Sequence, residues 1–224
     1  MKKLAPLLSL ILLLSVLAAG CHHRMRSEIK GNGHQERQKR QVASFTSIST
    51  NGDFTVEVTC QKDLSLEIEG DDNVLPLITT EVSNNVLQVK STQNYSPSEP
   101  VRIRISVPNL EGLSVNGAGH FDIKGMNNDK FEIDSNGAPA ITVAGTTKMI
   151  DIAANGAGKV DTQNLHAGRA VVDARGVARI DLDVSDQLDV DISGPSSVTY
   201  SGNPTVHQSI KGPGKLTRKG GEGA

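Results

Sequence analysis

The residues of this chain that are best suited to catalysis form two acid–base pairs close together in the sequence, Asp173 with Arg175 and Arg179 with Asp181. Lyases that act on acidic polysaccharides use carboxylates and arginines on a β-sheet wall, together with a divalent cation. Within each pair, however, the spacing is that of alternate, solvent-facing positions on an ordinary strand. We therefore interpret the four residues as part of a solvated face.

The sequence contains no other pattern that is typical of an active site or a metal site. Gly-x-Ser-x-Gly, His-Glu-x-x-His and Cys-x-x-Cys are all absent. No acidic loop supplies the several oxygens that calcium needs, and a metal role for the adjacent His22 and His23 is not favoured. We expect a protein without catalytic residues, bound metal or cofactor.

A different chemistry is indicated at Cys21. Two lysines at the start of the chain precede an apolar run over residues 4–17, which ends in Ala18-Ala19-Gly20, and this order is typical of an export signal. The run of about 14 residues is too short for a membrane-spanning helix of roughly 20. The segment resembles the signal of bacterial lipoproteins, which implies removal of residues 1–20 and a lipid on the Cys21 thiol. The alternative is a plain secretory signal followed by an incidental cysteine.

Residues 21–44 are predicted to form a flexible tether between the lipid and a folded domain. Residues 22–41 carry six basic side chains against two acidic ones and show no apolar periodicity. This positive charge either lies along anionic lipid head groups or only keeps the spacer solvated. From Val42 onward, 15 basic residues stand against 23 acidic ones. Because phosphate binding needs a basic surface, no nucleic acid partner is expected.

The segment Phe54–Cys60 alternates apolar and polar residues, as expected of a β-strand with one buried face. Cys60 has the same parity as Phe54, which places its thiol on the apolar side. We expect an inert, buried thiol. If Cys21 carries lipid, Cys60 has no disulfide partner within the chain, because the sequence has 2 cysteines.

The rest of the chain repeats with a period close to twenty. The marker is a glycine that recurs after 20, 19, 20, 18 and 18 residues, at Gly117, Gly137, Gly156, Gly176, Gly194 and Gly212. Apolar or small residues stand at even distances from these glycines, and polar or charged residues stand at most of the odd ones. Even spacing is the period of a β-strand, so each repeat predicts a strand, a tight bend and a second strand.

Coils of this kind bury their apolar rows by stacking, with neighbouring strands about 4.8 Å apart. The fold predicted over residues 45–218 is therefore all-β, a parallel β-helix with coils of about 20 residues. The same signature at Asn51-Gly52 predicts roughly three further coils before Gly117, with a protruding loop near Ser96-Pro97-Ser98. Residues 219–224 are expected to form a flexible tail.

The recurring Asn-Gly-Ala-Gly-like bends, together with the early strand over 52–58, resemble the bacterial head GIN domain family of "putative auto-transporter adhesins". The resemblance covers residues 45–218. It implies a right-handed β-helix similar in shape to pectin lyases, usually on an exported or lipid-anchored protein. It also implies an adhesive role without recognised catalytic residues.

Two non-catalytic functions remain open. The first is adhesion, because a solenoid offers a long surface to a protein or polysaccharide ligand. Tyr95 in the loop is the candidate contact, since the sequence has no tryptophan and its other tyrosine, Tyr200, has the parity of a core residue. The second is a role as a structural or periplasmic lipoprotein of the envelope. A polysaccharide lyase is less favoured. His22 is not the aspartate associated with inner-membrane retention, so the outer membrane is the expected location.

Overall fold

The computed structural model describes residues 28–220. These residues form fifteen strands and one short 3₁₀-helix: β1 (Ile29–Lys30), β2 (Gln35–Lys39), β3 (Ser47–Cys60), β4 (Ser65–Asp71), η1 (Leu75–Leu77), β5 (Ile78–Ser83), β6 (Val86–Ser91), β7 (Tyr95–Ser96), β8 (Arg102–Val107), β9 (Gly112–Gly137), β10 (Ala140–Ala154), β11 (Lys159–Arg175), β12 (Arg179–Ser193), β13 (Ser197–Ser201), β14 (Thr205–Lys211) and β15 (Lys215–Arg218). The predicted all-β class is confirmed. Among the described residues, no helix has the length and apolar character needed to cross a membrane. The predicted signal over 1–20, Cys21, His22 and His23, and residues 221–224 of the predicted tail lie outside the described range.

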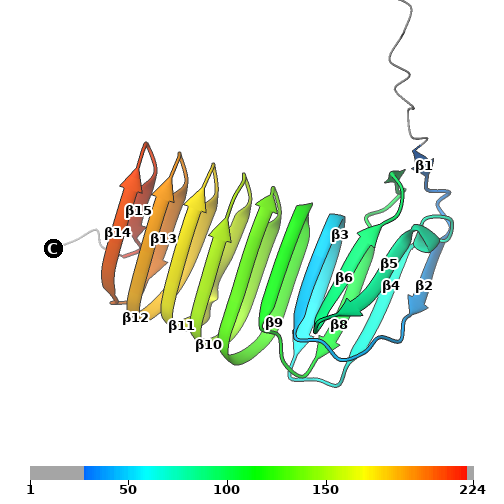
Figure 1. The fold of residues 1–224 in the computed structure, drawn as a ribbon, viewed down its shortest axis with the longest axis horizontal. Coiled ribbons are helices and arrows are strands. Elements are labelled where there is room, and N and C mark those ends of the chain that lie inside the picture. Colours follow the sequence, from blue (N-terminus) through cyan, green and yellow to red (C-terminus); the bar gives the residue numbers. More distant parts are fainter. Residues whose placement is uncertain (1–27, 221–224) are drawn as a thin grey trace, which may run out of the picture.

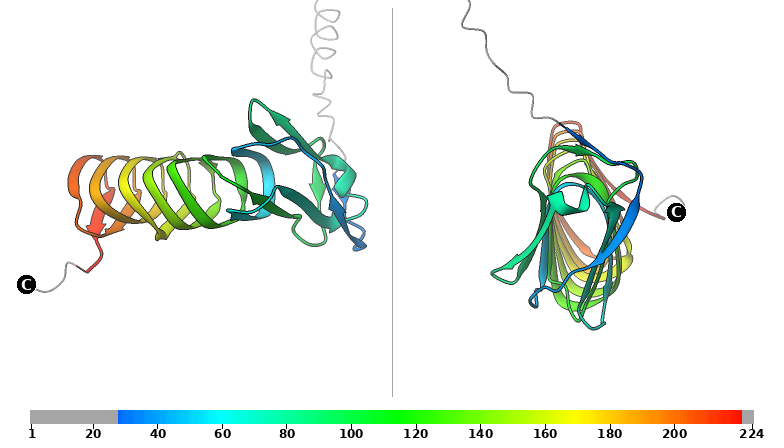
Figure 2. Two further views of the ribbon diagram at one scale, coloured as in Figure 1. Left: turned by 90° about the horizontal axis from the view of Figure 1, so that it is seen from below. Right: turned by 90° about the vertical axis from the view of Figure 1, so that its right-hand side faces the viewer.

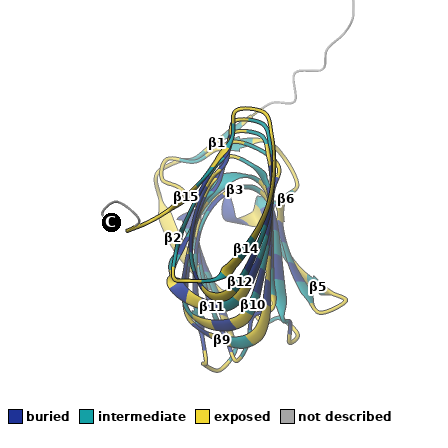
Figure 3. Ribbon diagram, turned by 90° about the vertical axis from the view of Figure 1, so that its left-hand side faces the viewer, coloured by how far each residue is buried: buried dark blue, intermediate teal, exposed yellow. Residues whose placement is uncertain are grey.

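Four long strands, β9 to β12, bend around successive coils, and each pairs in parallel with the next (Figures 1 and 2). In this register Ile152 lies between Ile133 of the preceding coil and Val172 of the following one. Figure 3, which looks along the stack, shows a flattened section with dark buried positions alternating with exposed ones along each wall. The even spacing of apolar residues in the sequence thus becomes a continuous core inside the coils.

The recurring glycines stack on one another at one bend of the coils. Gly137 has a φ of 135°, and a Cβ placed on it would lie 2.1 Å from the carbonyl oxygen of Gly117. A Cβ on Gly156 would lie 2.1 Å from the carbonyl oxygen of Gly137. The period in the sequence therefore reflects a backbone contact too close for a residue with a Cβ. Beside the glycines, Asn155 Nδ2 donates a hydrogen bond of 3.2 Å to Asn136 Oδ1.

The stretch between Gly52 and Gly117 does not form the three coils that the period predicts. Gly52 of β3 lies directly beside Gly117 of β9, and β6 and β8 pair with the other edge of β3. β5 and β6 form an antiparallel hairpin, whose turn residues Asn84 and Asn85 have positive φ, and β4 pairs antiparallel with β8. The prediction was wrong because this stretch has hairpin turns where the later repeats have the glycine bend. The sheet is consequently mixed.

Residues 28–44, which composition assigned to a flexible tether, pack against the domain instead. β2 pairs antiparallel with β4, and β1 pairs in parallel with β7. The buried carboxylate of Asp71 accepts hydrogen bonds from the Gly33 backbone N–H at 2.9 Å and from Gln35 Nε2 at 3.0 Å. Because these contacts are made by backbone and polar groups, apolar periodicity gave no sign of them.

Two basic side chains of the same segment are engaged within the domain. Arg37 Nη2 lies 3.1 Å from Glu69 Oε2. Arg40 donates hydrogen bonds to the carbonyl oxygens of Ile78, at 2.5 Å, and Leu75, at 3.0 Å, and its burial lowers the pKa of the guanidinium. Neither lipid head groups nor a solvated spacer accounts for these two arginines.

The thiol of Cys60 lies inside the coils, as its parity predicts. Cys60 is 3% exposed, and burial raises the pKa of its thiol to about 11. A thiol that stays protonated at neutral pH is a poor nucleophile. The predicted burial of Cys60 is confirmed, and its low reactivity stays a prediction.

Candidate functional site

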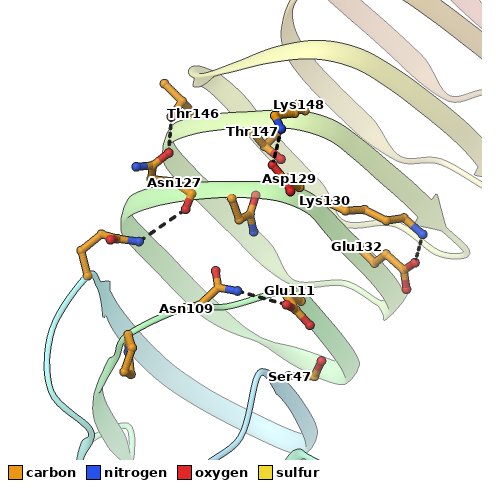
Figure 4. A pocket seen from close by; sticks show the side chains of 13 residues that line it. Ser47, Asn109, Glu111, Asn127, Asp129, Lys130, Glu132, Thr146, Thr147 and Lys148 are labelled. Carbon is orange, nitrogen blue, oxygen red and sulfur yellow. Dashed lines mark hydrogen bonds and ion pairs between the residues drawn. The ribbon is translucent and has the colours of Figure 1, made fainter.

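A polar groove of about 860 Å³ opens where β9 and β10 turn from one wall of the coils to the other (Figure 4). The end of β3 and the link between β8 and β9 complete it. The lining side chains are amides, hydroxyls and charged groups with one proline: Ser47, Gln61, Pro108, Asn109, Glu111, Asn127, Asn128, Asp129, Lys130, Glu132, Thr146, Thr147 and Lys148. A volume of this size lies in the range of ligand-binding pockets.

The parallel register brings the amides and hydroxyls of neighbouring coils together. Asn127 lies beside Thr146 and Asn128 beside Thr147. Thr146 Oγ1 donates a hydrogen bond of 3.4 Å to Asn127 Oδ1, and Gln61 Nε2 donates one of 3.4 Å to the Asn127 carbonyl oxygen (Figure 4). Polar groups from β9, from β10 and from the residue that follows β3 therefore lie next to one another in the groove.

Two amide oxygens in the groove are buried and accept no hydrogen bond from the described residues, Asn109 Oδ1 and Asn128 Oδ1. The nitrogens of the same amides are held in place: Asn128 Nδ2 donates to the Leu110 carbonyl oxygen at 2.6 Å, and Asn109 Nδ2 to Glu111 Oε1 at 3.1 Å. Buried acceptors in proteins are nearly always paired with a donor, so these two oxygens are exceptions, and both belong to side chains that line the groove.

Four of the five charged residues of the groove pair with one another, and the fifth, Glu111, accepts a hydrogen bond from Asn109. Lys148 Nζ lies 2.7 Å from Asp129 Oδ1, and Lys130 pairs with Glu132. These hydrogen bonds raise the pKa of both lysines, so the amines stay protonated and do not serve as general bases at neutral pH. Over residues 28–220, no group of three or more His, Cys, Asp or Glu side chains is placed to hold a metal ion. The side chains of the groove are thus equipped for hydrogen bonding.

The four residues considered for catalysis are divided between two strands. Asp173 and Arg175 end β11, whereas Arg179 and Asp181 begin β12, on the other side of the bend at 176–178. Arg175 pairs with Asp173, and Arg179 Nε lies 3.2 Å from Asp181 Oδ2. Within the described part of the chain, no hydrogen bond or ion pair joins one pair to the other. Each arginine is bound to the carboxylate two positions away. The prediction of a solvated face is wrong for Asp181, which lies between Asp161 and Thr199 of the neighbouring strands and is 3% exposed, whereas both arginines are exposed.

Tyr95, the predicted contact residue, lies in β7 and lines a second cleft of about 820 Å³. Its hydroxyl oxygen is buried and has no hydrogen-bond partner among residues 28–220. Burial, together with the negative charge of Asp53, raises the pKa of Tyr95 to about 12. Tyr200 is partly buried and packs against the core, in agreement with its parity. That Tyr95 contacts a ligand stays a prediction.

The residues of the groove in Figure 4 were not predicted from the sequence. Their signal is a pair of polar triplets, Asn127-Asn128-Asp129 and Thr146-Thr147-Lys148, which begin 19 residues apart. This distance matches the coil period. The glycine repeat marks one bend of each coil, and the triplets mark the opposite bend of two adjacent coils.

Several solved structures share the fold of this chain. A "putative adhesin" from Bacteroides fragilis is 22% identical, with a TM-score of 0.68, and the alignment covers 85% of this chain and 100% of that chain. A "putative lipid binding protein" from Parabacteroides distasonis is 19% identical, with a TM-score of 0.55 and coverage of 86% and 100%. A "putative adhesin" from Parabacteroides merdae is 16% identical, with a TM-score of 0.54 and coverage of 86% and 99%. At these identities the likeness concerns the fold alone.

No curated protein matches the chain. The model of the family described as "Putative auto-transporter adhesin, head GIN domain" matches residues 44–204. This range begins just before β3 and ends after β13, so it includes both the mixed N-terminal sheet and the glycine-marked coils. The chain therefore belongs to the head GIN domain family of "putative auto-transporter adhesins".

Proposed function

We propose that this chain is a non-catalytic binding protein of the bacterial cell envelope, and that the groove of Figure 4 holds a hydroxyl-rich polysaccharide. Membership of a family named for adhesion supports the binding role. The pairing of each catalytic candidate with a neighbour on its own strand supports the non-catalytic reading.

The observation that carries the proposal is the row of amide and hydroxyl side chains that line one groove. A sugar hydroxyl both donates and accepts hydrogen bonds, as a side-chain amide does. Asn127 and Asn128 lie on one coil, and Thr146 extends the polar row on the adjacent coil. Because the lysines of the groove are neutralised by their own carboxylates, the groove is better matched to uncharged hydroxyls than to a strongly ionic ligand.

We also propose that the coils wind as a right-handed parallel β-helix. Strands β9, β10, β11 and β12 are neighbours in sequence order and pair in parallel. Connections between parallel strands of one sheet are right-handed in about 98% of cases, because strand twist favours that hand. An experimental structure of the coils tests the handedness directly.

The groove can be tested with a variant that changes only its surface. Asn127 and Thr146 are exposed, so the double change Asn127→Ala and Thr146→Val leaves the core intact. Binding to a panel of immobilised envelope and host glycans is expected to identify a ligand for the wild type and to fall at least tenfold in the variant. Thr142→Val, at an exposed position of the same strand outside the groove, is the matched control. Equal binding by all three proteins would contradict the proposed site.

The proposed location depends on a lipid at Cys21, attached after export. We expect the wild-type chain to sediment with membranes and the Cys21→Ala variant to become soluble after cell fractionation. Protease added to intact cells then distinguishes the two faces of the envelope. Digestion of the wild type places the domain at the cell surface, as adhesion requires, whereas protection places it in the periplasm.

A structural role in the envelope is the second candidate, and the C-terminal end of the stack favours it. β14 pairs with β12 alone, so its other edge has no strand partner in the described part of the chain. A free edge accepts a strand from another molecule, although exposed lysines such as Lys211 and Lys215 weaken that tendency. Deletion of the folded domain separates the two roles. Loss of cell attachment with an intact envelope supports adhesion, and the reverse supports a structural role.

A further inference from the structure

The cleft beside Tyr95 has a different character from the groove of Figure 4. The segment Ser91–Pro100 forms one side, and the first bend of the glycine stack forms the other, at Gly52 and Gly119. A Cβ on Gly119 would lie 2.2 Å from the carbonyl oxygen of Phe54, so the stacking of β9 on β3 excludes a side chain there. The cleft has a volume of about 820 Å³, and the side chains of Asp53 and His120 line it beside these glycines.

The described lining of this cleft carries more acidic than basic side chains. Its ionisable residues are Glu28, Asp53, Tyr95 and His120, and its lining includes no lysine or arginine. Among the described residues, no basic nitrogen lies within 4.0 Å of the Asp53 or Glu28 carboxylate.

The carboxylates of the coils are of two kinds. Five of them pair with a basic side chain two positions away: Asp122 with Lys124, Glu132 with Lys130, Asp161 with Lys159, Asp173 with Arg175, and the buried Asp181 with Arg179. Asp134, Asp151 and Asp191, like Asp53, have no basic nitrogen within 4.0 Å among the described residues, but they do not line the Tyr95 cleft. Two positions away from Asp53 stand Asn51 and Thr55. The negative charge of Asp53 is thus left available to a cation from outside the protein.

Tyr95 adds an aromatic surface next to this charge. Asp53 and Tyr95 both line the cleft, and the buried Tyr95 hydroxyl accepts no hydrogen bond from residues 28–220. An ammonium group near a tyrosine ring gains a cation–π interaction. Pro97 and Pro100 supply apolar walls that suit the carbon chain of an amine.

We propose that the Tyr95 cleft binds a primary ammonium group carried on an aliphatic chain, with Asp53 as its counter-ion and the Tyr95 ring beside it. An anionic ligand would meet two unpaired carboxylates, and a neutral sugar would leave them uncompensated. A lysine side chain and a free polyamine present the same ammonium group. The site is independent of the polysaccharide groove, because the two share no lining residue.

The test is a calorimetric titration of the full chain, purified in detergent, with cadaverine at neutral pH and low salt. We expect saturable binding by the wild type and no binding of 1,5-pentanediol, which has the same carbon chain without charge. Asp53 is exposed, so Asp53→Asn keeps the fold and should weaken cadaverine binding about tenfold. Tyr95→Leu should weaken it about threefold, and Asp63→Asn, at an exposed carboxylate outside the cleft, should leave it unchanged.

Two further arms identify the source of the ammonium group. Binding of Nα-acetyl-lysine methylamide with an affinity similar to that of cadaverine indicates a lysine side chain as the natural ligand. Binding of both cadaverine and spermidine, without binding of the lysine derivative, indicates a polyamine. The proposal is overturned if cadaverine fails to bind the wild type at millimolar concentration, if pentanediol binds equally well, or if Asp53→Asn binds like the wild type. Loss of glycan binding by the groove variant affects none of these outcomes.

Discussion

Asp71 Oδ2 accepts a hydrogen bond of 2.7 Å from the backbone N–H of Ser98, and Ser98 Oγ donates to the other carboxylate oxygen at 2.5 Å. The same carboxylate accepts from the Gly33 N–H and from Gln35 Nε2. One fully buried aspartate thus joins the N-terminal segment, the end of β4 and the loop after β7. The loop near Ser98, predicted to protrude, is tied to the domain at this point.

This cluster predicts a pH-dependent stability. Burial raises the pKa of Asp71, but the hydrogen bonds from the Ser98 side chain and backbone, Gly33 and Gln35 outweigh it and leave the pKa below its ordinary value. A carboxylate whose pKa is lower in the folded state stabilises the fold above its unfolded pKa of about 3.9, and the stabilisation is lost as pH falls through the folded pKa. We expect Asp71→Asn to reduce the free energy of unfolding by about 1–3 kcal/mol at pH 7, because the amide keeps one acceptor oxygen but replaces the other with an NH2 group that faces a hydrogen-bond donor.

Urea unfolding of both proteins between pH 7 and pH 2.5 measures this effect. The difference between the wild type and Asp71→Asn should be constant from pH 7 to about pH 5 and shrink below pH 4. Asp63→Asn is a suitable control, since Asp63 is an exposed carboxylate. A difference that does not change with pH would mean that the Asp71 charge contributes nothing beyond the shape of the side chain.

The glycine stack gives a second prediction. Gly156 lacks a positive φ, but a Cβ there would lie 2.1 Å from the Gly137 carbonyl oxygen. Gly33 has a φ of 81° with nothing within 4 Å of its Cβ position. Gly156→Ala should therefore cost about 3 kcal/mol or more, because rigid stacked backbones cannot yield without breaking ladder hydrogen bonds. Gly33→Ala should cost about 1 kcal/mol through backbone conformation alone.

Thermal or urea unfolding of the two variants beside the wild type separates these contributions. If Gly156→Ala loses no more stability than Gly33→Ala, the coil spacing adapts to a methyl group and close contact does not explain the glycine period. A large loss at Gly156 alone assigns the period to steric exclusion between coils.

The repeating coils could be predicted from the sequence because their signals are local. Even spacing marks the inward positions, as at Ile133 and Ile152, and the recurring glycine marks the bend at Gly137 and Gly156. Each of these residues meets its own equivalent in the next coil, so one repeat contains the information for its neighbour.

The N-terminal sheet and the groove could not be predicted, because they depend on contacts between segments far apart in the sequence. The signature at Asn51-Gly52 does not indicate that β3 pairs directly with β9, although Gly52 and Gly117 are 65 residues apart. Asp71 is one of many aspartates in the sequence, and its burial depends on Gly33 and Ser98 from distant parts of the chain. The amides of the groove in Figure 4 meet only once β3, β8 and β9 are assembled.

A third prediction concerns the reactivity of Cys60. In the Cys21→Ala variant, Cys60 is the one remaining thiol. Since burial raises its pKa to about 11, its reaction with a disulfide reagent at pH 8 should be on the order of a hundredfold slower than that of an exposed thiol with a pKa of about 8.5. The rate should rise about tenfold per pH unit from pH 8 to 10. Reaction in urea provides the unfolded reference, and equal rates with and without urea would contradict the burial of Cys60.

The last prediction concerns the ion pairs between β3, β4 and β8. Arg104 Nη1 lies 2.6 Å from Glu69 Oε2, and Arg104 also contacts Glu57 and Glu67. The hydrogen bond from Arg104 is the main cause of the lowered pKa of Glu69. Arg104→Leu leaves three carboxylates close together and should cost about 1–2 kcal/mol at pH 7, after allowance for their partial exposure to water. Its neighbour Arg102 makes one longer contact, 3.8 Å to Glu57, so Arg102→Leu should cost less than about 0.5 kcal/mol.

The pH dependence of this pair of variants distinguishes charge pairing from packing. Because the pKa of Glu69 is lowered in the fold, the stabilisation from Arg104 is present above the unfolded pKa of about 4.3 and is lost as pH falls through the folded value. The difference between the wild type and Arg104→Leu should therefore decrease from pH 7 to pH 3, and high salt at pH 7 should reduce it as well. Equal losses in Arg104→Leu and Arg102→Leu, independent of pH, would show that the aliphatic stem of the arginine matters and its charge does not.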